Sequence, residues 1–165
     1  LTTGESANLA ALVGSEAVNI DLAESPQPIL HVGWVGRRLP LHATASGKAL
    51  LAWRSRAEVL EILPDPLVRH TQETITNPEA LEAELAAIRA RGYATAWAEL
   101  SPDLASVAAP VRDHQGRVIA AIAVSAPVTR LDRDQLAALA KLVREEAEHL
   151  SVRMGHRPAV QVHSG

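Results

Sequence analysis

The segment from Gly36 to Ala52 constrains the fold of this chain more than any other. It reads GRRLPLHATASGKALLA, so a run of small residues separates a strand exit from an apolar helix start. Thr44 and Ser46 are good N-cap candidates, because a hydroxyl can accept a hydrogen bond from the first turn of a helix. The small residues leave the N–H groups of this junction open to a carboxylate or a phosphate, although a simple helix cap explains the same residues.

A nucleotide-binding P-loop is excluded at this junction. That motif requires Gly, four further residues and then Gly-Lys-Ser/Thr. Here His42 occupies the first glycine position, and Ala49 follows Lys48 where the magnesium-binding hydroxyl should stand. Lys48 lies one turn into the helix, where the helix dipole disfavours a cation. We therefore expect Lys48 to hold an acidic neighbour or to face solvent rather than to act in catalysis.

The composition limits the classes of function. A chain of 165 residues can bury one core, and with only 2% aromatic residues that core must be mainly aliphatic. The net charge of −3 argues against nucleic-acid binding by this segment itself, because such modules usually carry a basic excess. The absence of cysteine excludes disulfides, thiol catalysis and cysteine-ligated metals. With no signal peptide and no apolar run of membrane length, a cytoplasmic location is expected.

The periodicity of the apolar residues predicts an α+β domain with a largely antiparallel sheet. Strand-like segments come in pairs joined by short turns, and the helices stand apart from them, unlike an alternating βαβ pattern. The expected helices begin in the small-residue junction, at the Ser55–Glu58 capping box, at Asn77–Pro78 and near Asp132, the last ending near Met154. The expected strands are residues 6–13, 16–24, 29–35, 93–98, 104–112 and 117–126.

The hairpin around residues 113–116 carries a second candidate site. If its loop holds those four residues, Ser106 lies opposite Ala123 and diagonal to Ser125 on one face of the sheet. Two hydroxyls would then point the same way from a surface of small residues, or each would only bond to backbone. A register slip of one residue would separate them.

The sequence gives weak support to metal binding or catalysis. The seven histidines lack the spacing of metal ligands, so no metal is expected. A hydrolytic triad can be drawn from Ser46 or Ser106 with His42 and an aspartate, but neither serine lies in Gly-x-Ser-x-Gly. Glu99 and Asp103 could form a carboxylate pair, although solvated loop acids are far commoner. No catalytic residue is therefore predicted, and His42 is expected to orient its loop.

Four segments carry a resemblance to a known family. They are TGESANLA at 3–10, the junction at 36–52, RGYA at 91–94 and SVAAPVRDHQGRVIAAIAVS at 106–125. Together, in this order and spacing over nearly all of residues 2–154, they resemble the effector-binding domain of IclR-type bacterial transcription regulators.

The resemblance implies a GAF-like fold, with a curved antiparallel sheet flanked by helices and a ligand pocket on one face. Residues 1–154 would form this domain and residues 155–165 a flexible C-terminal tail. An N-terminal winged helix-turn-helix DNA-binding domain is expected outside this chain, which begins at Leu1 without a methionine. The intact regulator would bind operator DNA as a homodimer or tetramer, and a small effector would modulate that binding. No cofactor and no membrane partner are implied.

The resemblance also implies pocket positions, one at a time. Some family members carry an acid where Ala96 stands and a further hydroxyl where Ala123 stands. Because an acid would repel an anion, Ala96 favours an anionic ligand with an apolar body, its carboxylate near Ser46. The expected ligand-binding residues are Pro28, His31, Trp34, Ala45, Ser46, Ala96, Leu104, Ser106, Ala123 and Ser125.

The sequence leaves open two alternatives to a ligand sensor. One is a small hydrolase-like enzyme on the same fold, although cysteine-based redox chemistry is excluded. The other is a pure oligomerisation module, which would fill the pocket with its own side chains.

Overall fold

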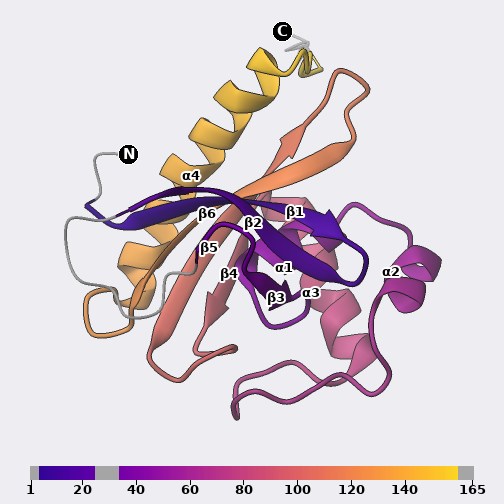
Figure 1. The fold of residues 1–165 in the computed structure, drawn as a ribbon, viewed down its shortest axis with the longest axis vertical. Helices are drawn as coiled ribbons and strands as arrows, with labels where there is room; N and C mark the ends of the chain where they lie inside the picture. Colours follow the sequence, from indigo (N-terminus) through magenta and orange to yellow (C-terminus); the bar gives the residue numbers. More distant parts are fainter. Residues whose placement is uncertain (1–3, 25–33, 160–165) are drawn as a thin grey trace, which may run out of the picture.

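A six-stranded antiparallel sheet forms the centre of the computed structural model, which describes residues 4–24 and 34–159. The strands follow the spatial order β3-β2-β1-β6-β5-β4 (Figure 1). They are β1 (Ser6–Val13), β2 (Glu16–Ala23), β3 (Arg38–Pro40), β4 (Ala94–Trp97), β5 (Leu104–Arg112) and β6 (Val118–Pro127). The helices of the described residues are α1 (Ala45–Leu51), α2 (Arg56–Ile62), α3 (Pro78–Arg91) and α4 (Arg133–Arg153). The expected α+β class and curved antiparallel sheet are confirmed.

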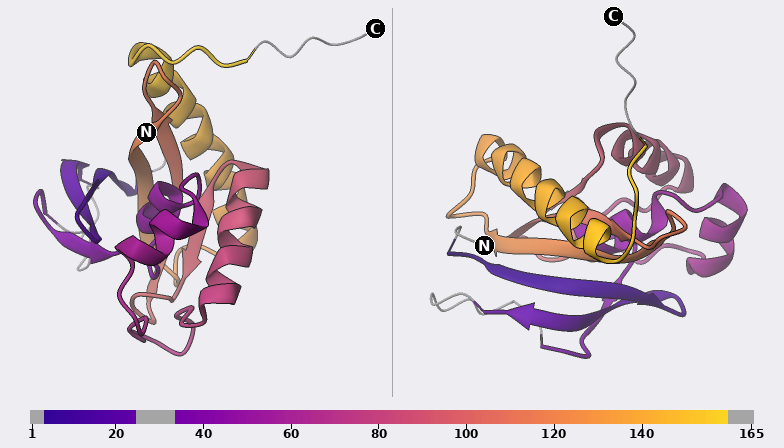
Figure 2. Two further views of the ribbon diagram at one scale, coloured as in Figure 1. Left: turned by 90° about the vertical axis from the view of Figure 1, so that its right-hand side faces the viewer. Right: turned by 90° about the horizontal axis from the view of Figure 1, so that it is seen from above.

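The helices cover both faces of the sheet (Figure 2). On β5, Ala105 and Val107 belong to the apolar cluster beneath α4, whereas Ala108 belongs to the cluster beneath α1 and α3. This alternation follows from the two-residue period of a strand. Because the facing residues are mostly alanine and valine, the helices can approach the sheet closely. The core therefore consists of two thin aliphatic layers, as the low aromatic content predicts.

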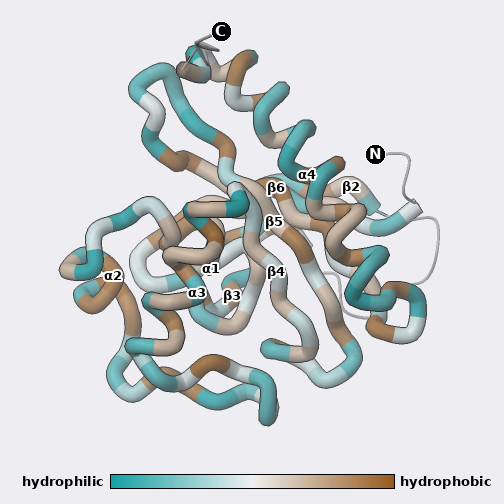
Figure 3. The backbone as a smooth tube through the Cα atoms, turned by 180° about the vertical axis from the view of Figure 1, so that it is seen from behind, coloured by the Kyte–Doolittle hydropathy of each residue, from teal (hydrophilic) through white to brown (hydrophobic). Residues whose placement is uncertain are grey.

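Helix α4 forms where its capping signal and apolar stripe predict. Asp132 accepts a hydrogen bond from the N–H of Gln135 at 2.7 Å, and the Gln135 side chain accepts one from the N–H of Asp132 at 2.9 Å. Leu136, Leu139 and Val143 are buried against the sheet. Figure 3 shows hydrophilic positions along the rest of this helix. In the described ranges, none of the helices has the length and apolarity needed to cross a membrane.

Helix α1 begins at the small-residue junction. Thr44 is its N-cap: the hydroxyl accepts a hydrogen bond from the N–H of Gly47 at 3.1 Å and donates one to the Pro40 carbonyl at 2.7 Å. Ser46 lies in the first turn instead. Every residue of α1 is buried, so the cap fixes an internal helix rather than a surface one.

Replacing Thr44 by valine keeps the shape of the side chain and removes both hydrogen bonds. We expect Thr44→Val to lower the free energy of unfolding by about 1–2 kcal/mol, the usual cost of losing an N-cap. Urea unfolding measures this loss, and Thr95→Val on β4 is the control, since β-branched residues suit strands equally well. An unchanged midpoint for Thr44→Val would show that the cap does not stabilise α1.

The expected strand at residues 29–35 is wrong where the structure describes it. Residues 29–33 lie outside the described ranges, and Trp34 and Val35 precede β3 without belonging to a strand. Gly36 has a φ of +90°, and its N–H donates to the Asn19 carbonyl at 2.7 Å. The chain therefore turns at Gly36 and the strand follows the turn. Pro40 ends this short strand at the edge of the sheet, where a missing N–H is tolerated.

The loop of the β5–β6 hairpin is one residue longer than expected. Arg112 pairs with Val118, so the loop holds residues 113–117. Asp113 organises it, because Asp113 Oδ1 accepts hydrogen bonds from the N–H groups of Gln115 at 2.9 Å and Arg117 at 3.0 Å. Such local side-chain bonds favour turns.

A bulge adds a second shift of one residue in the same hairpin. Val111 pairs with Ala120 while Arg112 pairs with Val118, so Ile119 has no partner in the ladder. The loop and the bulge together move the register by two residues, and Ser106 lies opposite Ser125 rather than Ala123. The predicted pairing is wrong. Because the shift is even, the predicted common face of the two serines is confirmed.

Candidate functional site

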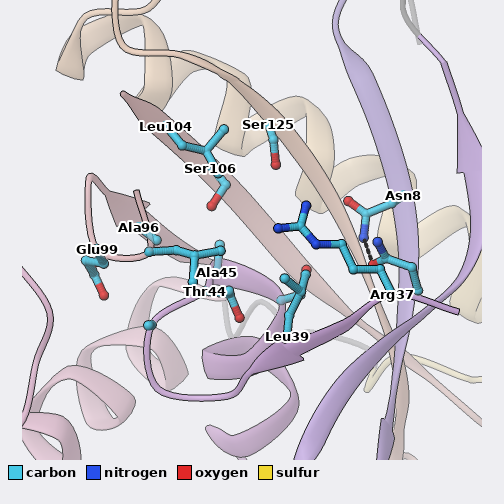
Figure 4. Close-up of a pocket in the computed structure, with 14 residues that line it drawn as sticks. Asn8, Arg37, Leu39, Thr44, Ala45, Ala96, Glu99, Leu104, Ser106 and Ser125 are labelled. Carbon is cyan, nitrogen blue, oxygen red and sulfur yellow. Dashed lines mark hydrogen bonds between the residues drawn. The ribbon is translucent and has the colours of Figure 1, made fainter. Parts of the chain in front are cut away.

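A pocket lies between the sheet and the junction that leads into α1 (Figure 4). Its volume is about 520 Å³, counted with the part that opens to solvent. Strands β1, β5 and β6 form one wall, and the residues before α1 form another. The lining residues are Asn8, Asn19, Arg37, Leu39, Ala43, Thr44, Ala45, Ser46, Ala96, Glu99, Leu100, Leu104, Ser106 and Ser125.

The structure brings most of the expected binding residues together around this pocket. Those that line it are Ala45, Ser46, Ala96, Leu104, Ser106 and Ser125. Ala123 and Trp34 do not line it. Ala123 is buried in the core beneath α1, opposite Ala108, and Trp34 is 67% exposed. Pro28 and His31 lie outside the described residues. Ligand binding by any of these residues stays a prediction.

Ser106 and Ser125 place two hydroxyls side by side on the pocket wall. They face each other across the β5–β6 pair, and Ser106 is 9% exposed. Within residues 4–24 and 34–159, neither hydroxyl has a hydrogen-bond partner. Sheltered polar groups of this kind usually find a partner. Here they can meet a polar group of a small molecule.

Arg37 is a charged pocket residue that the sequence analysis did not predict. Figure 4 shows its side chain extending into the cavity, toward Ser106 and Ser125. Its guanidinium carbon lies 5.6 Å from the centre of the Trp34 ring, and its carbonyl accepts a hydrogen bond from the Asn19 N–H at 3.0 Å. The guanidinium adds a cation with a planar fork of donors to a wall of small residues.

The alternating direction of side chains along an extended chain distinguishes Arg37 from Arg38. Arg38 lies in β3 and binds Glu16 at 3.4 Å on the surface. Adjacent residues of an extended chain point to opposite sides, so one arginine of the pair faces the pocket and the other faces solvent. This alternation could have predicted that Arg37 faces the pocket only if the strand after Gly36 had been predicted first.

Asn8 and Asn19 complete the polar side of the pocket. The Asn8 amide donates to Asn19 Oδ1 at 2.8 Å (Figure 4). Asn19 is 2% exposed. The pair lies on β1 and β2, so the curl of the sheet brings amide groups beside the arginine. Their sequence signal was only that of polar residues in alternating strands.

Lys48 is fully buried behind the pocket and binds two acids. Its ammonium lies 2.9 and 3.0 Å from the two Glu99 oxygens and 3.7 Å from Glu84 Oε1. Glu84 also accepts from Arg91 at 2.8 Å. Burial raises the pKa of Glu99, although Lys48 acts against that rise. The expectation that Lys48 holds an acidic neighbour is confirmed.

The segment that carries Glu99 is fixed by threonine hydroxyls. Thr71 donates to the Ala98 carbonyl at 2.5 Å, and Thr74 donates to the Glu99 carbonyl at 2.6 Å. Ala98 has a φ of +55°, which a non-glycine residue rarely adopts. These bonds hold the turn that places Glu99 against both Lys48 and the pocket.

His42, in the junction before α1, is buried and contacts a backbone carbonyl. His42 is 2% exposed, its Nε2 lies 2.7 Å from the Val68 carbonyl, and burial lowers its pKa. This contact ties the residues before α1 to the segment after α2, which agrees with the expected orienting role. In the part of the chain that the structure describes, no group of three or more metal-binding side chains occurs.

Comparisons with known proteins agree with this architecture. The family model "Bacterial transcriptional regulator IclR C-terminal" matches residues 1–152. The HTH-type transcriptional regulator BhcR of Paracoccus denitrificans is 39% identical over 156 residues, which are 94% of this chain and 56% of that protein. The first curated relatives are matched over only 56–62% of their own length.

Solved structures give the same result. The crystal structure of the C-terminal domain of the E. coli regulator KdgR superposes with a TM-score of 0.83 at 37% identity, covering 93% of this chain and 90% of that one. A double mutant of the PobR inducer-binding domain from Acinetobacter, in complex with 3-hydroxybenzoic acid, gives a TM-score of 0.82 at 29% identity. That match covers 90% of this chain and 89% of the PobR chain.

Proposed function

Because the chain belongs to the IclR family of bacterial transcriptional regulators, as their C-terminal effector-binding domain, we propose that its pocket binds a small organic acid whose binding modulates the attachment of the regulator to operator DNA. The family consists of transcriptional regulators and not of enzymes. The proposal concerns the class of effector, its position and the response of the whole regulator.

The position of the Arg37 side chain is the observation that carries this proposal, because its guanidinium extends into the pocket toward Ser106 and Ser125. The other charged side chain among the lining residues is Glu99, and Lys48 binds Glu99 from behind. A carboxylate forms strong, charge-assisted hydrogen bonds with a guanidinium such as that of Arg37. The acid bound by the PobR domain supports the same ligand class.

The remaining lining suits the rest of such a molecule. The hydroxyls of Ser106 and Ser125 can meet a second polar group, and Leu104, Ala96 and Leu39 can contact an apolar body. Ala45 and Ser46 line the same cavity, so their backbone N–H groups can share the carboxylate with Arg37. The polar groups that line this pocket, Arg37 with the hydroxyls of Ser106 and Ser125, support a sensor over a pure oligomerisation module.

In the intact regulator, an N-terminal winged helix-turn-helix would contact the operator, and this domain would assemble as a homodimer or tetramer. Such a protein acts on DNA, so we place it in the bacterial cytoplasm. The effector can change DNA binding only if it binds one quaternary arrangement more tightly than the other. The difference in effector-binding free energy between the two arrangements sets how strongly the effector changes DNA binding.

The proposal predicts that a carboxylic acid will stabilise the domain and that Arg37→Gln will markedly reduce this stabilisation. Thermal unfolding against aromatic and aliphatic acids, with neutral analogues, would find a binder, because a ligand at one hundred times its Kd adds about 2.7 kcal/mol. Removing a charged hydrogen-bond partner costs about 1.5–3 kcal/mol, so Arg37→Gln should weaken the Kd by about tenfold or more.

Arg38→Gln is the matched control, since Arg38 is the adjacent arginine and faces solvent. Ser46→Glu is a second test, because its carboxylate would repel the ligand. Binding restricted to neutral or cationic compounds, or equal losses in the Arg37 and Arg38 variants, would contradict the proposal.

A further inference from the structure

A second cavity lies at the C-terminal end of α1, whereas the effector pocket lies at its N-terminal end. It opens where the turn after α1 meets the loop of the β5–β6 hairpin, and it shares no lining residue with the first pocket. Its volume is about 1150 Å³, counted with its open mouth. The lining residues are Leu50, Trp53, Arg54, Glu58, Arg112, Gln115, Gly116, Arg117, Val118 and Ile119.

Arg112 lines this cavity without an acidic partner. Its guanidinium carbon lies 4.6 Å from the centre of the Trp53 ring, and its Nη1 donates to the Gly116 carbonyl at 3.0 Å. No carboxylate forms an ion pair with it in residues 4–24 and 34–159. The side chain is half-buried, and this burial lowers its pKa. The stacking on Trp53 fixes the guanidinium plane while leaving donors unused.

Arg54 supplies a second underused guanidinium. Its Nε is shielded from solvent and has no hydrogen-bond partner within the described chain. Its Nη1 lies 3.8 Å from Glu58 Oε1, which is too far for a hydrogen bond. Glu58 is also engaged in the α2 capping box, where its carboxylate accepts from the N–H of Ser55 at 2.8 Å.

Arg117, the third arginine of the cavity, is compensated. Its Nε and Nη2 donate to Asp113 Oδ2 at 3.0 and 2.9 Å. The unused donors of the cavity therefore belong to Arg54 and Arg112. Arginine forks match the geometry of phosphate as well as carboxylate, and a tetrahedral oxyanion can accept from two guanidinium groups at once.

We propose that this cavity is a second ligand site, in which Arg54 and Arg112 bind the phosphate group of a small metabolite. Leu50, Val118 and Ile119 form an apolar wall beside the two arginines and would contact the organic part of that molecule. The site is separate from the effector pocket, so an acid and a phosphorylated compound could act on the same domain. A bound phosphate would supply the hydrogen-bond partner that Arg54 Nε lacks, once the guanidinium turns toward the cavity.

Titration calorimetry at constant ionic strength tests this site, with inorganic phosphate and phenyl phosphate as probes and chloride as the reference anion. We expect saturable binding of both probes, tighter for phenyl phosphate because of the apolar wall. Arg112→Gln and Arg54→Gln should each weaken binding by about tenfold or more, the loss of one charged contact. Arg56→Gln is the matched control, because Arg56 lies two residues away and lines a different groove.

Each variant is first checked for cooperative urea unfolding, so that a loss of fold is not taken for a loss of binding. Binding that never saturates, or that survives unchanged in both test variants, would overturn the proposal. Sedimentation measures the oligomeric state and independently tests whether the cavity is a contact between copies of the chain. If Arg112→Gln dissociates an oligomer while phosphate has no effect on the wild type, the cavity is a contact between copies and the proposal is wrong.

Discussion

Gly47→Ala is expected to unfold this domain or to lower its free energy of unfolding by about 4 kcal/mol, among the largest effects of a single substitution. An ideal Cβ at Gly47 would overlap the carbonyl oxygen and Cα of Leu41 and lie 2.6 Å from the Leu41 carbonyl carbon. These are backbone atoms, which cannot rotate away. In an ordinary helix the same substitution would stabilise by about 1 kcal/mol, so the expected sign is opposite to helix propensity.

Urea unfolding followed by circular dichroism measures the effect. Gly14→Ala is the control, since Gly14 has a φ of +61° but no atom near its missing Cβ. That variant should lose only about 1 kcal/mol, the cost of a left-handed residue with a side chain. A Gly47→Ala protein as stable as the control would show that α1 can move away from Leu41.

Lys48→Met is the second substitution with a large expected effect. It leaves Glu99 buried with neither its 2.9 Å nor its 3.0 Å contact to the ammonium, and it leaves Glu84 with Arg91 alone. Breaking a buried ion pair by removing one partner costs about 3–5 kcal/mol. Lys141→Met, on the exposed face of α4, is the control and should change stability by less than about 0.5 kcal/mol.

The loss should depend on pH. Burial already holds the pKa of Glu99 above its ordinary value, and removing Lys48 raises it further. A carboxyl group with a raised pKa in the folded state favours folding when protonated, and this contribution is lost as the pH rises through the folded pKa. The stability gap between wild type and Lys48→Met should therefore shrink from about pH 8 to about pH 5.

A double variant separates the lost charge from lost packing. Glu99→Gln removes the buried charge that Lys48→Met leaves behind, so the double variant should be more stable than Lys48→Met alone at about pH 8. A gap that stays constant with pH, together with no rescue by Glu99→Gln, would contradict the role assigned to this ion pair.

Local signals in the sequence predicted the elements whose formation depends on residues that are near one another in the chain. The Asp132–Gln135 capping box, the Pro78 start of α3 and the stripe along α4 all appear as expected, because each depends on residues within a few turns of one another. The strand β3 was missed, since its existence depends on Gly36 turning the chain and on pairing with β2.

The pocket was predicted in part, for a similar reason. The small residues of the junction and the serines of the hairpin could be placed from the resemblance. Arg37 could not, because its direction depends on the missed strand. The full burial of Lys48 was also beyond the sequence, since Glu99 lies 51 residues away along the chain.

The bulge in the β5–β6 hairpin lets this part of the chain change length without moving the pocket. Because Arg112 pairs with Val118 and Val111 pairs with Ala120, deleting Ile119 would join two segments that are already in register, and Ser125 would stay opposite Ser106. Deleting one residue from the paired segment between Ala120 and Ser125 would instead shift Ser125 by one position and turn it to the α4 side. The bulge is therefore a place where evolution can add or remove a residue while the pocket keeps its two hydroxyls.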